Sequence, residues 1–295
     1  LGKFSVILII VFLYLSTDFY YTKLKEFKTK KELNKTREKL KYSKLKNNFF
    51  RNLSHELKTP LNLIFSSLQM LELYNKEDEK SQQYIDITKQ NSYRLLRLIN
   101  NLLDLSKIED NSFNLNLQNI NIIELLENIT SSIKPHIKSE NKKIEFKTNF
   151  ASKIIACDPY KIERAILNLL SNAIKFTDPE DIITIKIAEK EDDILISISD
   201  TGIGIKEDKQ DIIFQEFGQV DKSLSRNHEG TGLGLPIVKS IIELHDGSIS
   251  LESEYQEGSK FTIKLPNKKI DEDEVQNNYK NNEVDMIKLE LSDIT

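Results

Sequence analysis

Apolar residues recur at steps of three and four along the first third of the chain, the spacing of one face of an α-helix. This stripe consists of Phe50, Leu53, Leu57, Leu61, Ile64, Leu68 and Leu71. A second stripe consists of Tyr84, Ile87, Leu95, Leu98, Leu102 and Leu105. The polar residues 75–80 between them predict a connection, and therefore a helical hairpin. Because one hairpin leaves its stripe half exposed, two copies are expected to pair into a four-helix bundle, as a homodimer.

After residue 112 the hydrophobic pattern changes to that of an α+β domain with one sheet. Short β-rich runs occupy residues 143–150, 182–188, 194–199, 248–252 and 260–265. Helical patterns occupy residues 122–138, 160–175 and 235–244. The tail after Pro266 is rich in Asn, Asp and Glu as far as residues 284–291, which are compatible with a short strand or helix.

The N-terminal residues form an apolar segment. Residues 4–15 carry no charge, and aromatic residues extend the segment to Tyr21. A bilayer core takes about 20 apolar residues, so we interpret residues 1–21 as the C-terminal part of a transmembrane helix. The alternative is the hydrophobic part of a secretory signal, which is shorter.

Charge is distributed unevenly along the 295 residues, whose net charge is −4. Residues 23–46 carry eleven Lys or Arg against three Glu. Their place directly after the apolar segment favours a helix that flanks a membrane on its cytoplasmic side. Nucleic-acid binding is the alternative, but no recognition-helix pattern accompanies the basic run, so no nucleic-acid partner is expected. The single cysteine, Cys157, excludes an internal disulfide.

His55 lies two residues from seam leucines on either side and is therefore predicted on the outer, solvent-facing side of the helix. The adjacent Glu56 can orient the imidazole or take its proton. Thr59 lies one turn further along the same face, and Pro60 predicts a bend just after the histidine. An imidazole with an ordinary pKa is mostly neutral at pH 7, so one ring nitrogen is available as a nucleophile.

A polar stripe crosses the helix predicted at residues 160–175. Asn168, Asn172 and Lys175 fall at i, i+4 and i+7 on an otherwise apolar helix. Two amides with a lysine suit a hydrated cation and phosphate oxygens. An ordinary solvated helix face is the alternative interpretation.

Two glycine-containing segments follow that helix. Residues 200–204 (Asp-Thr-Gly-Ile-Gly) end a predicted strand with an acid and two glycines, which alone indicates a turn. Residues 230–234 (Gly-Thr-Gly-Leu-Gly) open a helix and offer bare amides to an anionic phosphate. Between them Phe214, Phe217 and the mixed-charge residues 221–229 are typical of a mobile lid.

In their order and spacing these motifs resemble the sensor histidine kinases of bacterial two-component systems, over residues 40–266. The matching segments are residues 54–61 (Ser-His-Glu-Leu-Lys-Thr-Pro-Leu), Asn168 with Asn172, and residues 200–204, 214–217 and 230–234. The resemblance implies a dimerisation and phosphoacceptor hairpin followed by an ATP-binding domain of the Bergerat type. It also implies ATP and Mg²⁺ as cofactors, a homodimer, and a response regulator whose aspartate receives the phosphoryl group.

Carried over by position, the resemblance makes His55 the phosphoacceptor, Glu56 its general base and Thr59 a residue that places water for dephosphorylation of the regulator. Asn172 would ligate Mg²⁺, and Asp200 would accept a hydrogen bond from the adenine amine. The implied ATP-binding set is Asn168, Asn172, Lys175, Phe176, Asp200, Gly202, Gly204, Phe217, Arg226, Gly230, Thr231, Gly232, Leu233 and Gly234. Phe176 stands where a tyrosine is also common, and whether Gln219 or Arg226 reaches the γ-phosphate stays open.

The function expected is that of a histidine autokinase in the cell membrane, with its catalytic part in the cytoplasm and with phosphatase activity toward its regulator. One alternative is a Bergerat-type ATPase; its gyrase-like members place a glutamate base where this chain has Asn168, and an amide cannot take a proton. The other is a non-catalytic dimeric signalling scaffold, which would be expected to lose Asn172 or Asp200. The expected domains are a membrane segment (1–21), a linker helix (22–44), the phosphotransfer hairpin (45–112), the ATP-binding domain (113–266) and an acidic tail (267–295).

Overall fold

The predicted hairpin helices are present. The computed structural model describes residues 20–21, 23, 25, 27–37, 40, 43, 53–54, 56–71, 79–110, 112–215, 232–271 and 286–292. The chain divides into two units, Leu1–Arg51 and Asn52–Thr295. The described residues of the first unit are all helical and exposed. No helix among the described residues is long and apolar enough to cross a membrane, and of the predicted membrane segment only Tyr20 and Tyr21 are described.

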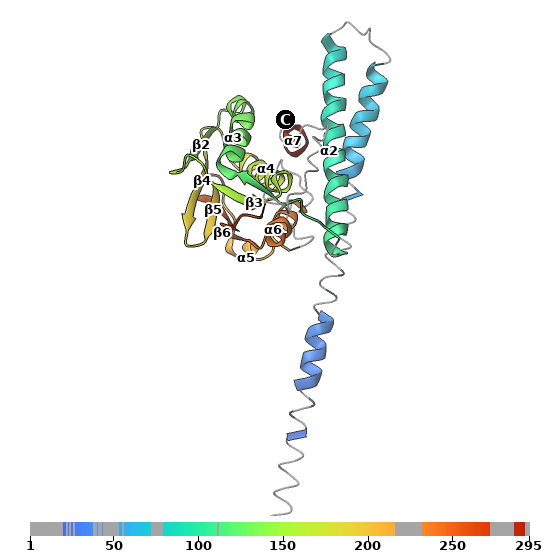
Figure 1. Ribbon diagram of the computed structural model, residues 1–295. Helices are drawn as coiled ribbons and strands as arrows, with labels where there is room; N and C mark the ends of the chain where they lie inside the picture. Colours follow the sequence, from blue (N-terminus) through green and yellow to red (C-terminus); the bar gives the residue numbers. More distant parts are fainter. Residues whose placement is uncertain are drawn as a thin grey trace, which may run out of the picture. The chain divides into compact units, whose positions relative to one another are not determined.

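In the second unit, residues 53–54 and 56–71 are helical and α2 spans Glu79–Glu109 (Figure 1). The predicted connection at residues 75–80 is wrong at its C-terminal end, because α2 already includes Glu79 and Lys80. Lys80 is exposed, and a helix tolerates a charged side chain at an exposed position. The apolar stripe is partly exposed within this one chain. Leu61 is 54% exposed and Leu68 47%, whereas Leu105 is 7% exposed.

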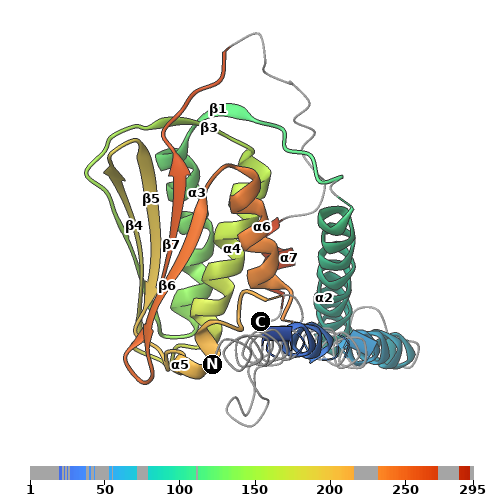
Figure 2. The same ribbon diagram turned by 90° about the horizontal axis from the view of Figure 1, so that it is seen from below.

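The main sheet has five strands in the order β2-β4-β5-β7-β6. Only β2 and β4 are parallel, and the other neighbours are antiparallel. The strands span Lys143–Lys147 (β2), Ile182–Lys190 (β4), Asp193–Asp200 (β5), Ser248–Glu254 (β6) and Gly258–Pro266 (β7). Three helices cover one face of this sheet (Figure 2): α3 (Ile122–Ser139), α4 (Pro159–Lys175) and α6 (Gly234–Leu244).

The core lies between this sheet and these helices. Along the central strands the side chains alternate in burial, as expected for a sheet covered on one face. In β5, for example, Ile194, Ile196 and Ile198 are at most 1% exposed. The helix α4 contributes a wide buried face, which includes Leu167 and Leu170 at 0% exposure. The five predicted strands and three predicted helices are therefore confirmed.

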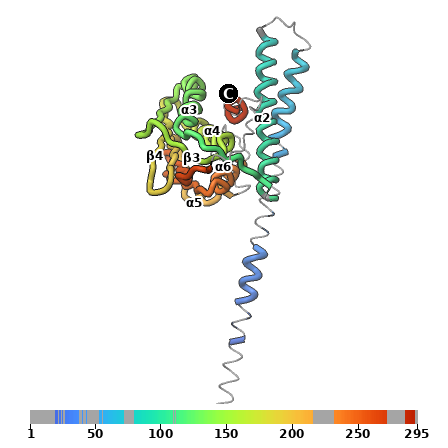
Figure 3. Tube along the Cα trace, in the orientation of Figure 1, coloured from blue at the N-terminus to red at the C-terminus, as the bar shows by residue number. Residues whose placement is uncertain are grey.

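The prediction of a single sheet is wrong. A separate two-stranded antiparallel sheet joins β1 (Gln118–Asn121) to β3 (Ile154–Cys157). Strand β1 has the sequence Gln-Asn-Ile-Asn and no hydrophobic alternation, so no periodic signal indicated it. The tail forms a short helix rather than a strand, α7 (Met286–Glu290), and a four-residue helix α5 spans Glu207–Gln210. Figure 3 follows the chain through the three covering helices and to α7 near its end.

Candidate ATP-binding and phosphoacceptor site

The helix α4 is the element on which the site is built. Asp158 is its N-cap, with a side chain that accepts a hydrogen bond from the Lys161 N–H at 3.1 Å. Pro159 follows at the first helical position, where its missing N–H costs nothing. The helix ends where the Phe176 N–H bonds the Asn172 carbonyl at 3.1 Å. These local signals place the predicted polar stripe along one well-defined helix.

Asn168 joins α4 to the start of α6. Its side chain is nearly buried, at 4% exposure. A Cβ added at Gly234 would lie 2.5 Å from Asn168 Oδ1, so any larger residue would require α6 or the amide to shift. Leu233, the N-cap residue of α6, is fully buried, and Gly232 before it has a φ of +70°. The described part of the predicted phosphate-binding segment therefore lies directly against the amide stripe.

Asp200 is the last residue of β5, and the loop that follows it packs against the C-terminal end of α4. Its Oδ1 accepts a hydrogen bond from the Gly202 N–H at 3.0 Å. Burial raises the pKa of this carboxyl to about 6, although hydrogen bonds from the backbone of Gly202 and Ser259 act in the opposite direction. A Cβ on Gly202 would overlap the carbonyl oxygen of Phe176, which also accepts the Ile203 N–H at 3.1 Å.

The three predicted nucleotide segments therefore meet on one helix. The loop after β5 packs against the end of α4, and the start of α6 packs against its middle. Lys175 and Phe176 lie on this last turn, half-buried and 37% exposed respectively. Backbone amides, amide side chains and a lysine in one place can bind an anion and a hydrated cation, with Asp200 as an acceptor beside them.

Part of the predicted site lies outside the described residues: His55, Phe217, Gln219, Arg226, Gly230 and Thr231. On the hairpin helix, Glu56 is half-buried and Thr59 is exposed. The helix continues through Pro60. Phe214, where the predicted lid begins, packs edge-to-face on Phe261 of β7 with ring centroids 6.2 Å apart.

Sequence reasoning did not predict the role of His245, which follows α6. Its Nε2 accepts the Asp158 N–H at 2.9 Å, and its Nδ1 lies 2.7 Å from the Ile241 carbonyl oxygen, to which it donates. Both ring nitrogens are thus used by a neutral imidazole, and burial lowers its pKa. This histidine connects the end of α6 to the N-cap of α4 and is not a free nucleophile.

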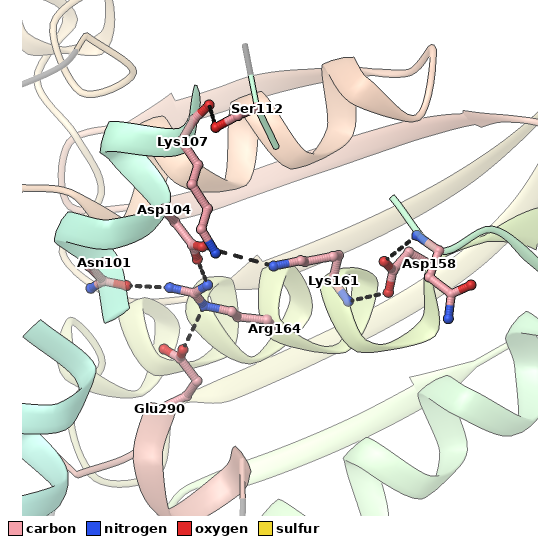
Figure 4. A network of polar contacts seen from close by, with 9 residues as sticks. Asn101, Asp104, Lys107, Ser112, Asp158, Lys161, Arg164 and Glu290 are labelled. Carbon is pink, nitrogen blue, oxygen red and sulfur yellow. Dashed lines mark hydrogen bonds and ion pairs between the residues drawn. The ribbon is translucent and has the colours of Figure 1, made fainter. Parts of the chain in front are cut away.

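Sequence reasoning also did not predict a buried polar cluster around Arg164 (Figure 4). Arg164 is 5% exposed, and its guanidinium bonds Asn101 Oδ1 at 2.7 Å and forms an ion pair with Asp104. Burial lowers the pKa of Arg164, and the Glu290 carboxylate opposes that shift. An arginine within the apolar run of α4 is the one signal that could have indicated this cluster.

Comparison with known proteins identifies both domains of the chain. Residues 45–111 match the His Kinase A (phospho-acceptor) domain, and residues 157–269 match the histidine kinase-, DNA gyrase B- and HSP90-like ATPase. The chain is 34% identical over 225 residues to the circadian input-output histidine kinase CikA of Synechococcus elongatus, a match that covers 75% of this chain and 30% of that protein. It spans less than half the length of the curated relatives that it matches.

Two solved structures share the fold. Full-length ShkA in complex with AMPPNP has a TM-score of 0.57 and 25% identity, over 72% of this chain and 44% of that one. The histidine kinase ThkA in complex with the response regulator protein TrrA has a TM-score of 0.52 and 22% identity, over 77% of this chain and 63% of that one. With both domain models matched in the expected order, the chain belongs to the sensor histidine kinases.

Proposed function

We propose that this chain is an ATP-dependent autokinase that phosphorylates His55 and passes the phosphoryl group to an aspartate of a response regulator. The observation that carries the proposal is the convergence of Asn168, Asp200 and Gly234 on α4. These contacts bring hydrogen-bond donors and acceptors together from three segments far apart in the sequence. The AMPPNP bound to ShkA supports the choice of nucleotide.

The proposal assigns roles to the predicted ATP-binding residues. The Asp200 carboxylate accepts from the adenine amine, and the amides at the start of α6 and Lys175 bind phosphate oxygens. The amide oxygen of Asn172, on the same face of α4 as Asn168, fits the oxygen ligands that Mg²⁺ prefers. Bound Mg²⁺ would neutralise charge on the phosphates. The lid residues Phe217, Arg226, Gly230 and Thr231 complete the proposed set.

The transfer step is an in-line displacement at the γ-phosphorus. An imidazole nitrogen of His55 forms the N–P bond as the bond to the β,γ-bridging oxygen breaks, and ADP leaves. Glu56 takes the ring proton and stabilises the imidazole as charge develops. Because phosphoryl transfer needs little covalent chemistry from the protein, positioning of the two domains dominates the rate.

Partners follow from the hairpin surface. The exposed apolar face that includes Leu61 and Phe65 supports pairing with a second copy into a four-helix bundle. The complex of ThkA with TrrA supports a response regulator as the acceptor. The exposed hydroxyl-bearing Thr59, one turn after the histidine, supports phosphatase activity toward that regulator. The apolar residues 1–21 and the basic residues 23–46 support anchoring in the cell membrane with the catalytic domains in the cytoplasm.

A plain ATPase is the second candidate, and Asn168 counts against it. The side chain at this position is a nearly buried amide packed on Gly234, and an amide cannot act as the base that activates water. The non-catalytic scaffold is disfavoured because Asn172 and Asp200 are both retained.

The test incubates the full chain with γ-labelled ATP and Mg²⁺, beside His55→Gln and the matched control His136→Gln. Acid-labile, alkali-stable label on the parent and on the control, but not on His55→Gln, would establish the proposed activity. Free phosphate released at equal rates by all three proteins, without label on protein, would identify an ATPase. Nucleotide binding without either product would identify a scaffold.

A further inference from the structure

The tail helix α7 carries a carboxylate that is completely buried. Glu290 is 0% exposed, and its Oε2 lies 2.9 Å from Arg97 Nε on α2. Its Oε1 lies 3.2 Å from Arg164 Nε on α4. A buried carboxylate is retained in a fold only when cations and donors compensate its lost hydration, and here two arginines from different domains do so.

The same arginine on α4 holds the hairpin directly. Arg164 bonds Asn101 and pairs with Asp104, and both partners lie on α2 (Figure 4). Asn101 is 3% exposed and Asp104 6%, so the contacts are screened little by solvent. We call Arg97, Asn101, Asp104, Arg164 and Glu290 the Arg164 cluster. It joins the phosphoacceptor hairpin, the ATP-binding domain and the tail through one buried set of charges.

These contacts are also the reason that α7 exists. A helix of five residues, Met286–Glu290, is far below the length that is stable alone in water. Its apolar side chains are buried: Leu289 is 3% exposed, and Leu291 just beyond the helix is 1% exposed. Just beyond the helix, the Ser292 carbonyl accepts a hydrogen bond from Arg94 Nε on α2 at 2.7 Å. The helix is formed by docking onto α2 and α4.

The Arg164 cluster lies one helical turn from the proposed nucleotide site. Asn168 lies one turn after Arg164 on α4, so the contacts of Arg164 with Asn101 and Asp104 hold this part of α4 against α2. Among the described residues, Arg164 contacts Asn101 and Asp104 on α2, and Glu290 contacts Arg97 on the same helix. Ser54 and Glu56, the neighbours of His55 in the sequence, belong to the other hairpin helix. In the proposed cycle the ATP-binding domain must bring the γ-phosphate to His55. It must then move away, so that the aspartate of a regulator can reach the phosphorylated histidine. A buried attachment to α2 opposes both movements.

We propose that α7 is an autoinhibitory clamp: its docking through Glu290 holds α4 against α2, and its release frees the ATP-binding domain to phosphorylate His55. The inhibitory part of this inference rests on the proposed autokinase function. The docking part does not, because it concerns only the contacts of α7.

The test uses two full-length variants that release α7 for different reasons. Glu290→Ala removes the carboxylate shared by Arg97 and Arg164, and Leu289→Asp places a charge in the apolar contact. The matched control is Glu145→Ala, which removes an exposed glutamate that pairs with Lys147 on the edge strand β2. Two quantities are measured: hydrogen exchange of the amides of residues 286–292, and the initial rate at which label appears on His55.

In the parent and the control, the α7 amides are expected to be protected from exchange. In both release variants exchange should rise at least tenfold, while β4 and β5 stay protected, which shows that the domain is folded. The labelling rate should rise at least threefold in both. Exchange of α7 in the parent at the rate of an unstructured peptide would overturn the clamp.

Release of α7 with an unchanged or lower labelling rate would overturn the inhibition and leave α7 a stabilising element. If no variant is labelled at all, the proposed autokinase fails, and the exchange data alone decide the docking. Faster exchange of α7 in both variants then supports attachment through the Arg164 cluster, and unchanged exchange contradicts it.

Discussion

The raised pKa of Asp200 makes a testable link between pH and the stability of the ATP-binding domain. The carboxyl titrates at about 6 in the folded chain, against an ordinary value of 3.8, chiefly because it is buried at the end of β5. The folded state therefore binds a proton more tightly than the unfolded state does. By linkage, this group makes the free energy of unfolding decrease as pH rises through the interval between the two pKa values.

The size of the effect follows from the two pKa values. Raising the pH from about 5 to about 7.5 removes at most ~1.4 kcal/mol of unfolding free energy through this carboxyl. Because the group is partly exposed, solvent screening lowers the expected change to about 1 kcal/mol. The substitution Asp200→Asn keeps the shape and one acceptor oxygen but cannot titrate, so its stability should lack this component.

Urea unfolding followed by circular dichroism, at both pH values and for both proteins, measures it. The relevant quantity is the pH-dependent change in the parent minus that in Asp200→Asn, since every other carboxylate cancels in the difference. A loss of stability on going to the higher pH that is about 1 kcal/mol larger in the parent is expected. Equal changes in the two proteins, or a larger loss in the variant, would refute the argument that burial raises this pKa.

Two further substitutions test the scaffold of the site. In Gly234→Ala the added methyl group would lie 2.5 Å from Asn168 Oδ1, so α6 or the amide must shift. ATP affinity measured by calorimetry should fall at least about tenfold, or ~1.4 kcal/mol. An unchanged affinity would show that the contact between Gly234 and Asn168 is not part of the ATP-binding site. In Asp158→Ala the N-cap acceptor of the Lys161 N–H is lost; urea unfolding should show a loss of about 1–2 kcal/mol, whereas the exposed control Asp208→Ala should change by less than about 0.5 kcal/mol.

The parts of the site that could be predicted from the sequence have local signals. The start of α4 is encoded by Asp158 and Pro159, and the glycines around α6 indicate a close approach of backbone to a neighbour. Strand β5 alternates in burial along its length, and Asp200 ends it. Such features depend on residues within a few positions of one another, and the pattern therefore reveals them.

The Arg164 cluster could not be predicted in that way. Arg164 and Glu290 are 126 positions apart. The apolar residues around Arg164 indicate that it is buried, but nothing in either segment identifies its partner. Their burial depends on the packing of α2, α4 and α7 against one another, and the hydrophobic periodicity of a single segment does not indicate this packing. The strand β1 was missed for the same reason, because its partner β3 lies more than thirty residues away and its own sequence is polar.

The side chain of Asn119 has a consequence for how this domain is connected. Its Nδ2 donates to the Ile270 carbonyl at 2.7 Å, and its Oδ1 accepts the Ile270 N–H at 3.0 Å, as a strand neighbour would. The chain thus enters the ATP-binding domain at β1 and leaves it at Ile270 through the same small sheet. A module whose two ends are adjacent can be transplanted or circularly permuted with little strain. The same adjacency keeps the segment that follows Ile270 close to β1, where the chain enters the domain. Its effective concentration there is in the millimolar range.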